Sequence, residues 1–232
     1  MKVRTIKTAI FPSHGNLLSF IARYLPKIAE QSILVVTSKI VALSEGRIVE
    51  KTTAAAKVEL IRQESDFMIR TKRTYLTIKD GMVMANAGID ESNADGKIIL
   101  LPRDSYRAAS KIRNFFKQKH QLKDFGVIIT DSRCFPLRAG ITGVVLGYAG
   151  FKGIKRYQGT PDIFGRPFKY SRVDVADSLA TAAVLCMGEG AQRQPLAIIS
   201  GAPVEYVERI RKDDLKIDVK EDMYGPIFRN IR

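Results

Sequence analysis

The residues best suited to chemistry gather in one short stretch, residues 86–93, which reads NAGIDESN. The stretch has an amide residue at each end and carries the hydroxyl of Ser92 and the carboxylates of Asp90 and Glu91. Oxygen ligands of these kinds suit hard cations such as magnesium or manganese better than zinc or copper, which prefer nitrogen and sulfur. The stretch does not match a calcium EF-hand loop, because the required glycine and glutamate are missing. It is therefore a candidate site for magnesium or manganese.

A second oxygen pair, Asp131 and Ser132, follows the apolar run at residues 126–130, just as the first stretch follows Met82–Ala85. Each pattern predicts a strand whose end presents a carboxylate. Acidic and small polar residues after strands are also ordinary turn formers. For either loop taken alone, the residues leave a metal site and a simple turn equally open.

Other elements are expected to position these loops. Apolar residues at helical spacing predict helices near residues 17–28, 58–64, 104–120, 174–187 and 204–211. Further apolar runs predict strands at residues 33–37, 97–101 and 196–200. Ser38 and Lys39 follow the strand at 33–37 and have the chemistry to meet a phosphate, although local sequence slightly favours their capping the next turn. We expect a mixed α/β (α+β) fold in a single domain over residues 1–232.

Composition narrows the class of protein. Hydrophobic residues at 45% and charged residues at 27% of 232 residues are ordinary for a globular protein. The chain has no signal-peptide core and no run of about 18 apolar residues, so we expect a cytoplasmic protein without a membrane segment. Cys134 and Cys186 lie far apart, which indicates neither a disulfide framework nor a zinc site.

The charge balance favours anionic partners. Lysine and arginine number 38 against 24 acidic residues, a formal net charge of +14. Such a surface attracts nucleic acid, a nucleoside triphosphate or a phosphorylated substrate. The basic residues are spread along the chain and do not choose between these partners. On the helix predicted at 104–120 a solvated basic face is favoured over nucleic-acid contact, because no aromatic or amide pattern for base readout accompanies it. Neither common phosphate loop occurs: Gly188 and Gly190 supply only part of a dinucleotide fingerprint, and there is no GxxxxGK[ST] motif.

Seven separated motifs, in their order along the chain, resemble the coenzyme F-420 gamma-glutamyl ligase family. They are VVTSKIVALSEGRIV, NAGIDESN, LLPRDSYRAASKIR, GVIITDS, TGVVLGYAG, YQGTPDIFGRPF and VADSLATAAVLCMGEG. The resemblance implies an enzyme that uses GTP and two divalent cations, with potassium as a further activator. Its substrates would be L-glutamate and an anionic small-molecule acceptor, a deazaflavin phosphodiester. The resemblance also implies a gamma-glutamyl ligase-like fold in an intertwined homodimer, with the nucleotide and metals near the subunit boundary.

The same resemblance assigns roles to individual residues. Those that would hold the metals are Asp90, Asp131, Ser132 and Glu189, where the family commonly has glutamine at the last position. The two aspartates would also be the catalytic residues. Those that would contact the nucleotide are Phe11, Pro12, Ser38, Lys39, Asn93, Met187, Gly188 and Gly190.

The sequence departs from the family pattern at two places. Leu43 stands where the family's VSKAEG motif has a lysine that contacts the nucleotide. The family's TDSxGRPFRxG is TDSRCFPLRAG here, so Cys134 and Phe135 replace a glycine and an arginine while Arg138 is kept. These changes leave the metal residues whole and bear on which nucleotide and substrate are used.

The retained residues imply ligation through an acyl-phosphate, with metals stabilising the transferring phosphoryl group. No side-chain nucleophile is required for that route. Two alternatives stay open: a family member that uses another nucleotide or acceptor, and a non-catalytic polyanion or nucleic-acid-binding protein. Binding to nucleic acid would fall steeply with salt and would need no divalent metal.

Overall fold

A five-stranded mixed sheet forms the centre of the protein. The computed structural model describes residues 1–227 of the 232. In spatial order the strands of this sheet are β1 (Lys2–Ile6), β12 (Leu196–Ser200), β2 (Ser32–Thr37), β8 (Phe125–Arg133) and β9 (Thr142–Ala149). Only β2 and β8 pair in parallel; the other neighbours are antiparallel. The two parallel strands therefore end at the same edge of the sheet.

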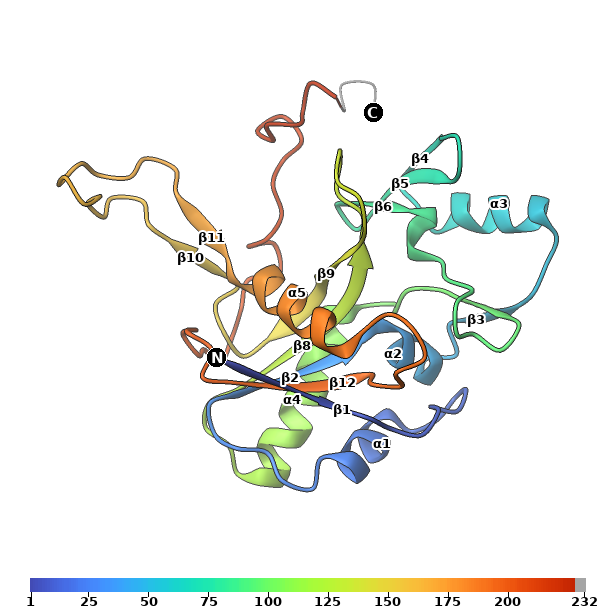
Figure 1. The fold of residues 1–232 in the computed structure, drawn as a ribbon, viewed down its shortest axis with the longest axis horizontal. Helices are drawn as coiled ribbons and strands as arrows, with labels where there is room; N and C mark the ends of the chain where they lie inside the picture. The colour runs from blue at the N-terminus through green and yellow to red at the C-terminus, as the bar shows by residue number, and fades with distance from the viewer. Residues whose placement is uncertain (228–232) are drawn as a thin grey trace.

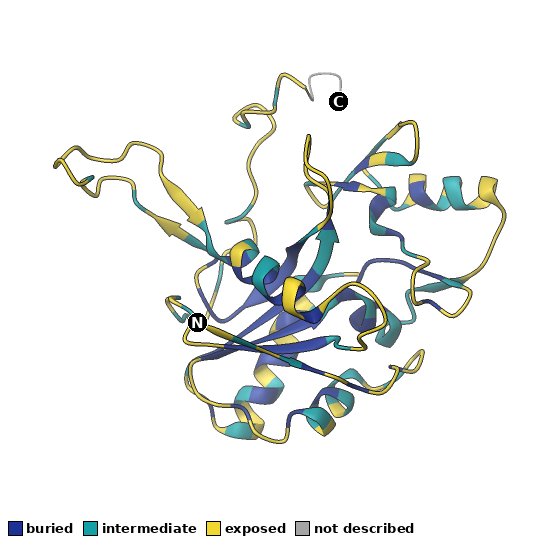
Figure 2. Cartoon of the chain, in the orientation of Figure 1, coloured by how far each residue is buried: buried dark blue, intermediate teal, exposed yellow. Residues whose placement is uncertain are grey.

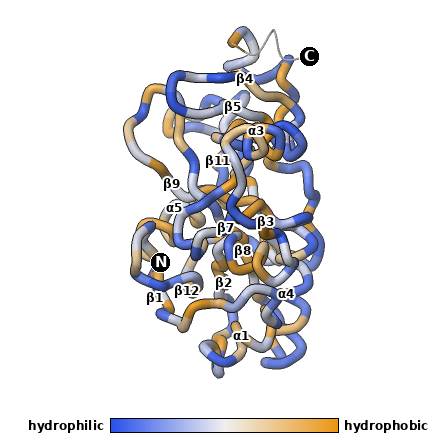
Figure 3. The backbone as a smooth tube through the Cα atoms, turned by 90° about the vertical axis from the view of Figure 1, so that its right-hand side faces the viewer, coloured by the Kyte–Doolittle hydropathy of each residue, from blue (hydrophilic) through white to orange (hydrophobic). Residues whose placement is uncertain are grey.

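Helices cover both faces of this sheet (Figure 1). On one face, α4 (Ser105–His120) packs against β8, and residues of α4 and of α1 (Leu17–Tyr24) share one core cluster with Val127 and Ile129, which alternate along β8. On the other face, α5 (Val175–Met187) packs against Ile128, which points the opposite way. Figure 2 shows the central strands buried between these layers, and Figure 3 shows apolar chain at β2, in the lower half of the side view.

A second lobe delivers the oxygen-rich stretch to the sheet. Its antiparallel strands and helix are β4 (Phe67–Arg70), β5 (Tyr75–Lys79), β6 (Met82–Ala85) and α3 (Ala54–Gln63). The short 3-10 turn η1 (Asn86–Gly88) follows β6, and β7 (Lys97–Ile99) pairs with β3 (Ile48–Glu50). The predicted strand at Met82–Ala85 is confirmed, and the strand predicted at 97–101 ends two residues earlier.

An arm projects from the body of the protein (Figure 1). We define the arm as residues 154–174, whose strands β10 (Ile154–Arg156) and β11 (Arg172–Asp174) pair antiparallel. Its connecting loop carries apolar side chains in solvent: Ile163 is 92% and Phe164 75% exposed. The burial colouring of Figure 2 shows the arm as one of the most exposed parts of the chain.

Helix boundaries follow local chemistry. Asp104 accepts the N–H of Arg107 at 2.8 Å and caps α4, and Asp174 accepts the N–H of Asp177 at 2.9 Å and caps α5, so both predicted starts are confirmed. Helix α1 ends at Tyr24, earlier than the predicted residue 28. Pro26 explains this difference, because the residue before a proline disfavours the helical conformation.

The predicted helix at residues 204–211 is wrong. This segment is irregular and runs along the chain that follows β9, where Val207 donates its N–H to the carbonyl of Gly150 at 3.0 Å. Lys152 in turn donates its N–H to the carbonyl of Glu205 at 2.9 Å. These partners satisfy backbone groups that a helix would otherwise satisfy, and the β-branched valines suit an extended path.

Two expectations about the whole chain stay predictions. Within the described residues, no helix is long and apolar enough to cross a membrane. That finding leaves the cytoplasmic location a prediction. The single domain over residues 1–232 also stays a prediction, and residues 228–232 lie outside the described part.

Candidate active site

The parallel pair β2 and β8 brings two predicted segments together. Thr37, the last residue of β2, and Thr130 of β8 are the last partners in this pairing, and β8 continues to Arg133, so that Asp131 and Ser132 lie within the strand and not in a loop after it as predicted. The next residues are Ser38 and Lys39, which begin α2 (Ser38–Ser44), and on β8 the pair 131–132. Clefts beyond the carboxyl ends of parallel strands are the usual place for ligands in α/β sheets. The sheet therefore explains why residues about ninety positions apart, here 38–39 and 131–132, share one edge.

Lys39 ties the oxygen-rich loop to this edge. Its Nζ lies 2.8 Å from Asp90 Oδ2 and donates to the carbonyl of Ser92 at 2.7 Å. The N–H of Ser92 donates back to Asp90 Oδ1 at 2.7 Å. Burial would raise the pKa of Asp90, but the hydrogen bonds from Lys39 and Ser92 and the charge of Lys39 outweigh it and lower the pKa below 3.8. Asp90 is thus held ionised beside a lysine.

Asp131 is the second carboxylate of the site. Its Oδ2 accepts a hydrogen bond from Arg133 Nη1 at 2.6 Å. Burial raises the pKa of Asp131 above its usual value, Arg133 opposes the rise, and the negative charge of Asp90 adds to it. The two aspartates are therefore close enough to act on each other electrostatically.

Glu189 reaches the site from the end of α5. Gly188 caps that helix with a φ of +77°, a conformation that L side chains rarely adopt, and so turns the chain toward β8. The hydroxyl of Ser132 donates to Glu189 Oε1. Ser132 points to the α5 face of the strand, whereas Asp131 points to the other face, as alternation along a strand requires.

The three carboxylates therefore form two neighbouring groups, one with Asp90 and Asp131 and the other with Ser132 and Glu189. Within residues 1–227, no three acidic, histidine or cysteine side chains are arranged to hold one ion together. The donor chemistry nevertheless suits magnesium or manganese, since every group is a carboxylate or hydroxyl oxygen. The assignment of these residues as metal ligands stays a prediction.

The predicted nucleotide contacts differ in exposure. Asn93 is exposed and has a φ of +51°, in the loop beside Ser92. Gly188 and Gly190 are also exposed. Phe11 and Met187, in contrast, are buried in the core with 5% and 2% exposure, so their side chains serve packing. Any contact from these two residues would come from the backbone.

The remaining predicted contacts lie near α2. Ser38 is buried with 7% exposure at the start of that helix, whereas Pro12 is exposed. The turn that contains Pro12 lies against the end of α2, because His14 donates its N–H to the carbonyl of Leu43 at 2.9 Å. Leu43 itself packs against the core beside Ala42. The leucine that replaces the family's lysine is therefore a packing residue.

Sequence reasoning missed Arg133. This residue is buried with 7% exposure and ends β8, two positions after Asp131. Because side chains two apart on a strand share a face, that spacing was a usable signal.

Sequence reasoning also missed Asp177, in the first turn of α5. Its Oδ1 accepts the N–H of Val145 at 2.7 Å. That N–H faces α5 at a bulge, where the pairing of β8 with β9 shifts between Ile129 and Thr130. Burial and the charge of Asp174 raise the pKa of Asp177 to about 7. A strand irregularity of this kind left no clear mark in the sequence.

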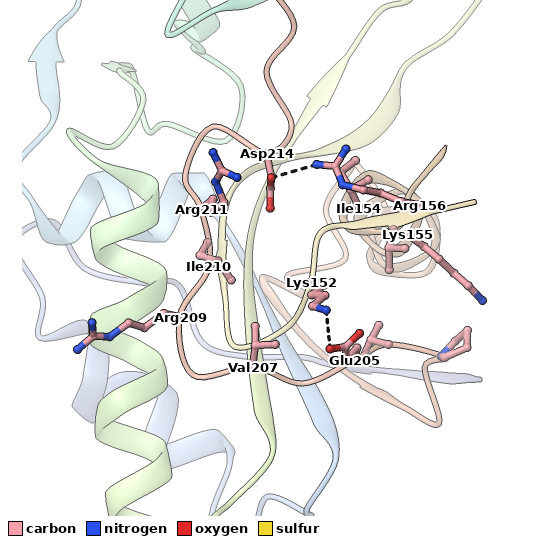
Figure 4. Close-up of a pocket in the computed structure, with 13 residues that line it drawn as sticks. Lys152, Ile154, Lys155, Arg156, Glu205, Val207, Arg209, Ile210, Arg211 and Asp214 are labelled. Carbon is pink, nitrogen blue, oxygen red and sulfur yellow. Dashed lines mark hydrogen bonds and ion pairs between the residues drawn. The ribbon is translucent and has the colours of Figure 1, made fainter. Parts of the chain in front are cut away.

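A separate cavity of about 780 Å³ lies at the end of β9 away from the carboxylates (Figure 4). Two ion pairs cross its lining, Lys152 with Glu205 at 2.6 Å and Arg156 with Asp214 at 3.3 Å. None of the predicted site residues lines it. The chemistry of the site therefore belongs to the strand edge and not to this cavity.

The fold and the site define an α/β protein with an oxygen-rich acidic centre at the carboxyl edge of two parallel strands. The model of the F420-0:Gamma-glutamyl ligase family matches residues 5–201. The coenzyme F420:L-glutamate ligase of Methanococcus maripaludis strain C6 is 32% identical over 90% of both chains. Those of Methanopyrus kandleri (33% identical, 82% of this chain and 83% of the relative) and Methanothermobacter thermautotrophicus (37%, 74% and 75%) are also similar.

The chain therefore belongs to the F420-0:gamma-glutamyl ligase family. It is an enzyme of the ligase class that forms carbon–nitrogen bonds. The family resemblance drawn from the seven motifs is confirmed.

Proposed function

We propose that this enzyme joins L-glutamate to F420-0, the deazaflavin phosphodiester acceptor, with GTP as the energy source. The names of its relatives support the acceptor and the amino acid. The observation that carries the proposal for this chain is the cluster at the strand edge, where Lys39, Asp90, Asp131, Ser132 and Glu189 come together from four separate segments. A reaction between three anionic substrates needs such a set of charges to hold phosphates in place.

The residues of the cluster fit two divalent cations. Asp90 and Asp131 would hold one, and Ser132 with Glu189 would hold the other, as magnesium or manganese. Such ions, when bound, neutralise triphosphate oxygens and the charge that develops on the transferred phosphoryl group. Lys39 keeps Asp90 ionised and fixes the loop after β6, and its ammonium also suits a phosphate oxygen.

The chemistry balances as two displacements. An acceptor carboxylate oxygen attacks the γ-phosphorus of GTP, the bond to the β-phosphate oxygen breaks, and GDP leaves. The amino group of L-glutamate then attacks the acyl carbon, the carbon–oxygen bond to phosphate breaks, and inorganic phosphate leaves. The amine loses a proton as the amide forms. The protein's part is to position the substrates and to screen their charge, so this route requires no side-chain nucleophile.

The experiment is a product assay. The protein is incubated with GTP, magnesium or manganese, L-glutamate and F420-0, and mass spectrometry follows addition of glutamate while GDP and phosphate are measured. We expect glutamate addition that requires all four components and releases one phosphate for each amide. Glu189→Gln should keep this activity, because glutamine is common at this position in the family, whereas Glu189→Ala should lose it. Metal-independent binding to nucleic acid without amide formation would contradict the proposal.

The alternative that a specific observation favours is an enzyme that uses a nucleotide other than GTP. Leu43 stands in place of a lysine that contacts the nucleotide in the family, and here it is partly buried and packs against the core. Leu43→Lys tests this: if the enzyme has shifted away from GTP, titration calorimetry with magnesium should detect a gain in GTP affinity in the variant. An unchanged affinity for GTP and ATP would mean that Lys39 and the metals already compensate for the leucine.

The homodimer belongs to the same proposal. The arm exposes Ile163, Phe164 and other apolar side chains that are costly to leave in water. A second copy of the chain would cover these side chains, and the resulting dimer would carry two active sites.

A further inference from the structure

Arg133 lies at the site with most of its N–H donors buried and unpaired within the described part of the chain. Its side chain is only 7% exposed, and its Nη1 donates to Asp131 Oδ2 at 2.6 Å. Its Nε and Nη2 are buried and have no hydrogen-bond partner among residues 1–227. A guanidinium offers five N–H donors, and buried donors without acceptors are costly to keep. Most of this arginine's binding capacity is therefore unused inside the protein.

Arg113 provides the comparison. It is also buried, with a side chain 5% exposed, but all three of its nitrogens have protein acceptors. Its Nε donates to the carbonyl of Phe125 at 2.8 Å, its Nη1 to Glu208 at 3.2 Å, and its Nη2 to the carbonyl of Val207 at 3.4 Å. A buried arginine that only supports the fold is thus fully partnered in this protein, and Arg133 is not.

The two unused nitrogens have a specific geometry. Nε and Nη2 point to the same side of a guanidinium and form a fork whose spacing matches two oxygens of a phosphate or a carboxylate. Arg133 shares the β8 face with Asp131, and the charge of Asp90 acts on that same carboxylate. The fork therefore lies beside the acidic centre.

The sequence around Arg133 adds an independent observation. The family pattern TDSxGRPFRxG has its first arginine at the position of Phe135, which here is 50% exposed. Arg133 occupies the unspecified position two residues earlier. The chain thus lacks one guanidinium of the pattern and carries another that the pattern does not require.

We propose that Arg133 binds an oxyanion of the substrates through Nε and Nη2, while Nη1 holds Asp131 in place. This inference rests on the proposed function. The oxyanion is either the γ-phosphoryl group of the nucleotide or a substrate carboxylate, since both present two oxygens to a fork. In this role Arg133 contacts substrate and replaces the charge missing at Phe135.

The test uses Arg133→Gln, Arg133→Lys and the control Arg113→Gln in the full chain. Titration calorimetry measures affinities for GTP and GDP with magnesium, and steady-state assays give KM for L-glutamate and F420-0. If the γ-phosphoryl group is the ligand, Arg133→Gln should weaken GTP binding at least tenfold and leave GDP binding unchanged. If a carboxylate is the ligand, GTP and GDP binding should be unchanged and KM for glutamate or F420-0 should rise at least tenfold.

Arg133→Lys keeps a positive charge beside Asp131 but loses the fork, so it should show most of the same loss. It also decides the question if Arg133→Gln does not fold. Arg113→Gln should lower the melting temperature without changing any of these affinities. Unchanged binding and KM values in a folded Arg133→Lys protein would overturn the inference. A wild type that binds neither GTP nor L-glutamate would instead overturn the proposed function.

Discussion

Lys39 Nζ lies 2.8 Å from Asp90 Oδ2, and this ion pair joins the first turn of α2 to the loop that follows β6. The contact connects the central sheet with the second lobe. It also places a cation on the carboxylate that the family resemblance assigns to a metal. The pair therefore links the position of the loop to the charge of the site.

Asp90→Asn should separate binding from folding. The two side chains are 26% and 42% exposed, so solvent screens the pair and its loss should cost about 0–1 kcal/mol. For a chain of this size that is a change of less than about 4 °C in melting temperature. Metal-dependent GTP binding should fall at least tenfold. A variant that keeps this binding in calorimetry would remove Asp90 from the metal site.

The same pair predicts how stability responds to acid. Because the folded pKa of Asp90 lies below its ordinary value of 3.8, the pair stabilises the fold at pH values above 3.8. That contribution is lost as pH falls through the lower, folded pKa. Melts of the wild type and Asp90→Asn should therefore converge in strong acid, and parallel curves down to that range would contradict the ion pair.

Asp177 should give stability a pH dependence opposite to that of Asp90. Burial raises its pKa to about 7, so between pH 3.8 and about 7 the folded protein keeps a proton that the unfolded chain has released. Stability contributed by this group therefore falls as pH rises through that window. Asp177→Asn keeps an oxygen for the N–H of Val145 and removes the titration. The melting temperature of this variant should depend less on pH than that of the wild type from about pH 4 to about pH 7.

Local signals predicted much of the fold. The caps Asp104 and Asp174 marked the starts of two helices, and apolar runs marked β2, which ends just before Ser38, and β8, which carries Asp131. The helix prediction at residues 204–211 failed because the backbone partners of this segment lie near Gly150, far away in the sequence. Helical spacing cannot register such a partner.

The candidate site could also be predicted only in part. Asp90, Asp131 and Glu189 came from motifs, but the contacts that set their charge did not. Lys39 meets Asp90 only because α2 and the second lobe pack together, and Asp177 meets Val145 only at the bulge. Long-range packing decides these contacts, and a single sequence records packing weakly.

The exposed apolar loop of the arm leads us to expect a dimer in solution. If a second copy covers its apolar loop, the wild type should be a dimer by light scattering, and the double substitution Ile163→Ser with Phe164→Ser should shift it toward monomer. Met223→Ser is the matched control, since Met223 is 81% exposed outside the arm. A monomeric wild type at micromolar concentration, or a double variant as dimeric as the control, would contradict the proposal.

Asp131→Asn should reverse its effect on stability when ligands are added. Burial and the charge of Asp90 raise the pKa of Asp131, so ionising this carboxylate costs more free energy in the folded protein than in the unfolded chain. The asparagine removes that penalty and keeps an oxygen for Arg133 Nη1, so the variant without ligands should melt at the same temperature as the wild type or higher. With manganese and GTP the order should invert, because the wild type gains binding free energy that the variant largely loses. Phosphate release with glutamate and F420-0 should fall in parallel. A variant that melts far lower without ligands would show that its ion pair with Arg133 serves the fold, and one that keeps full ligand stabilisation and phosphate release would exclude Asp131 from the mechanism.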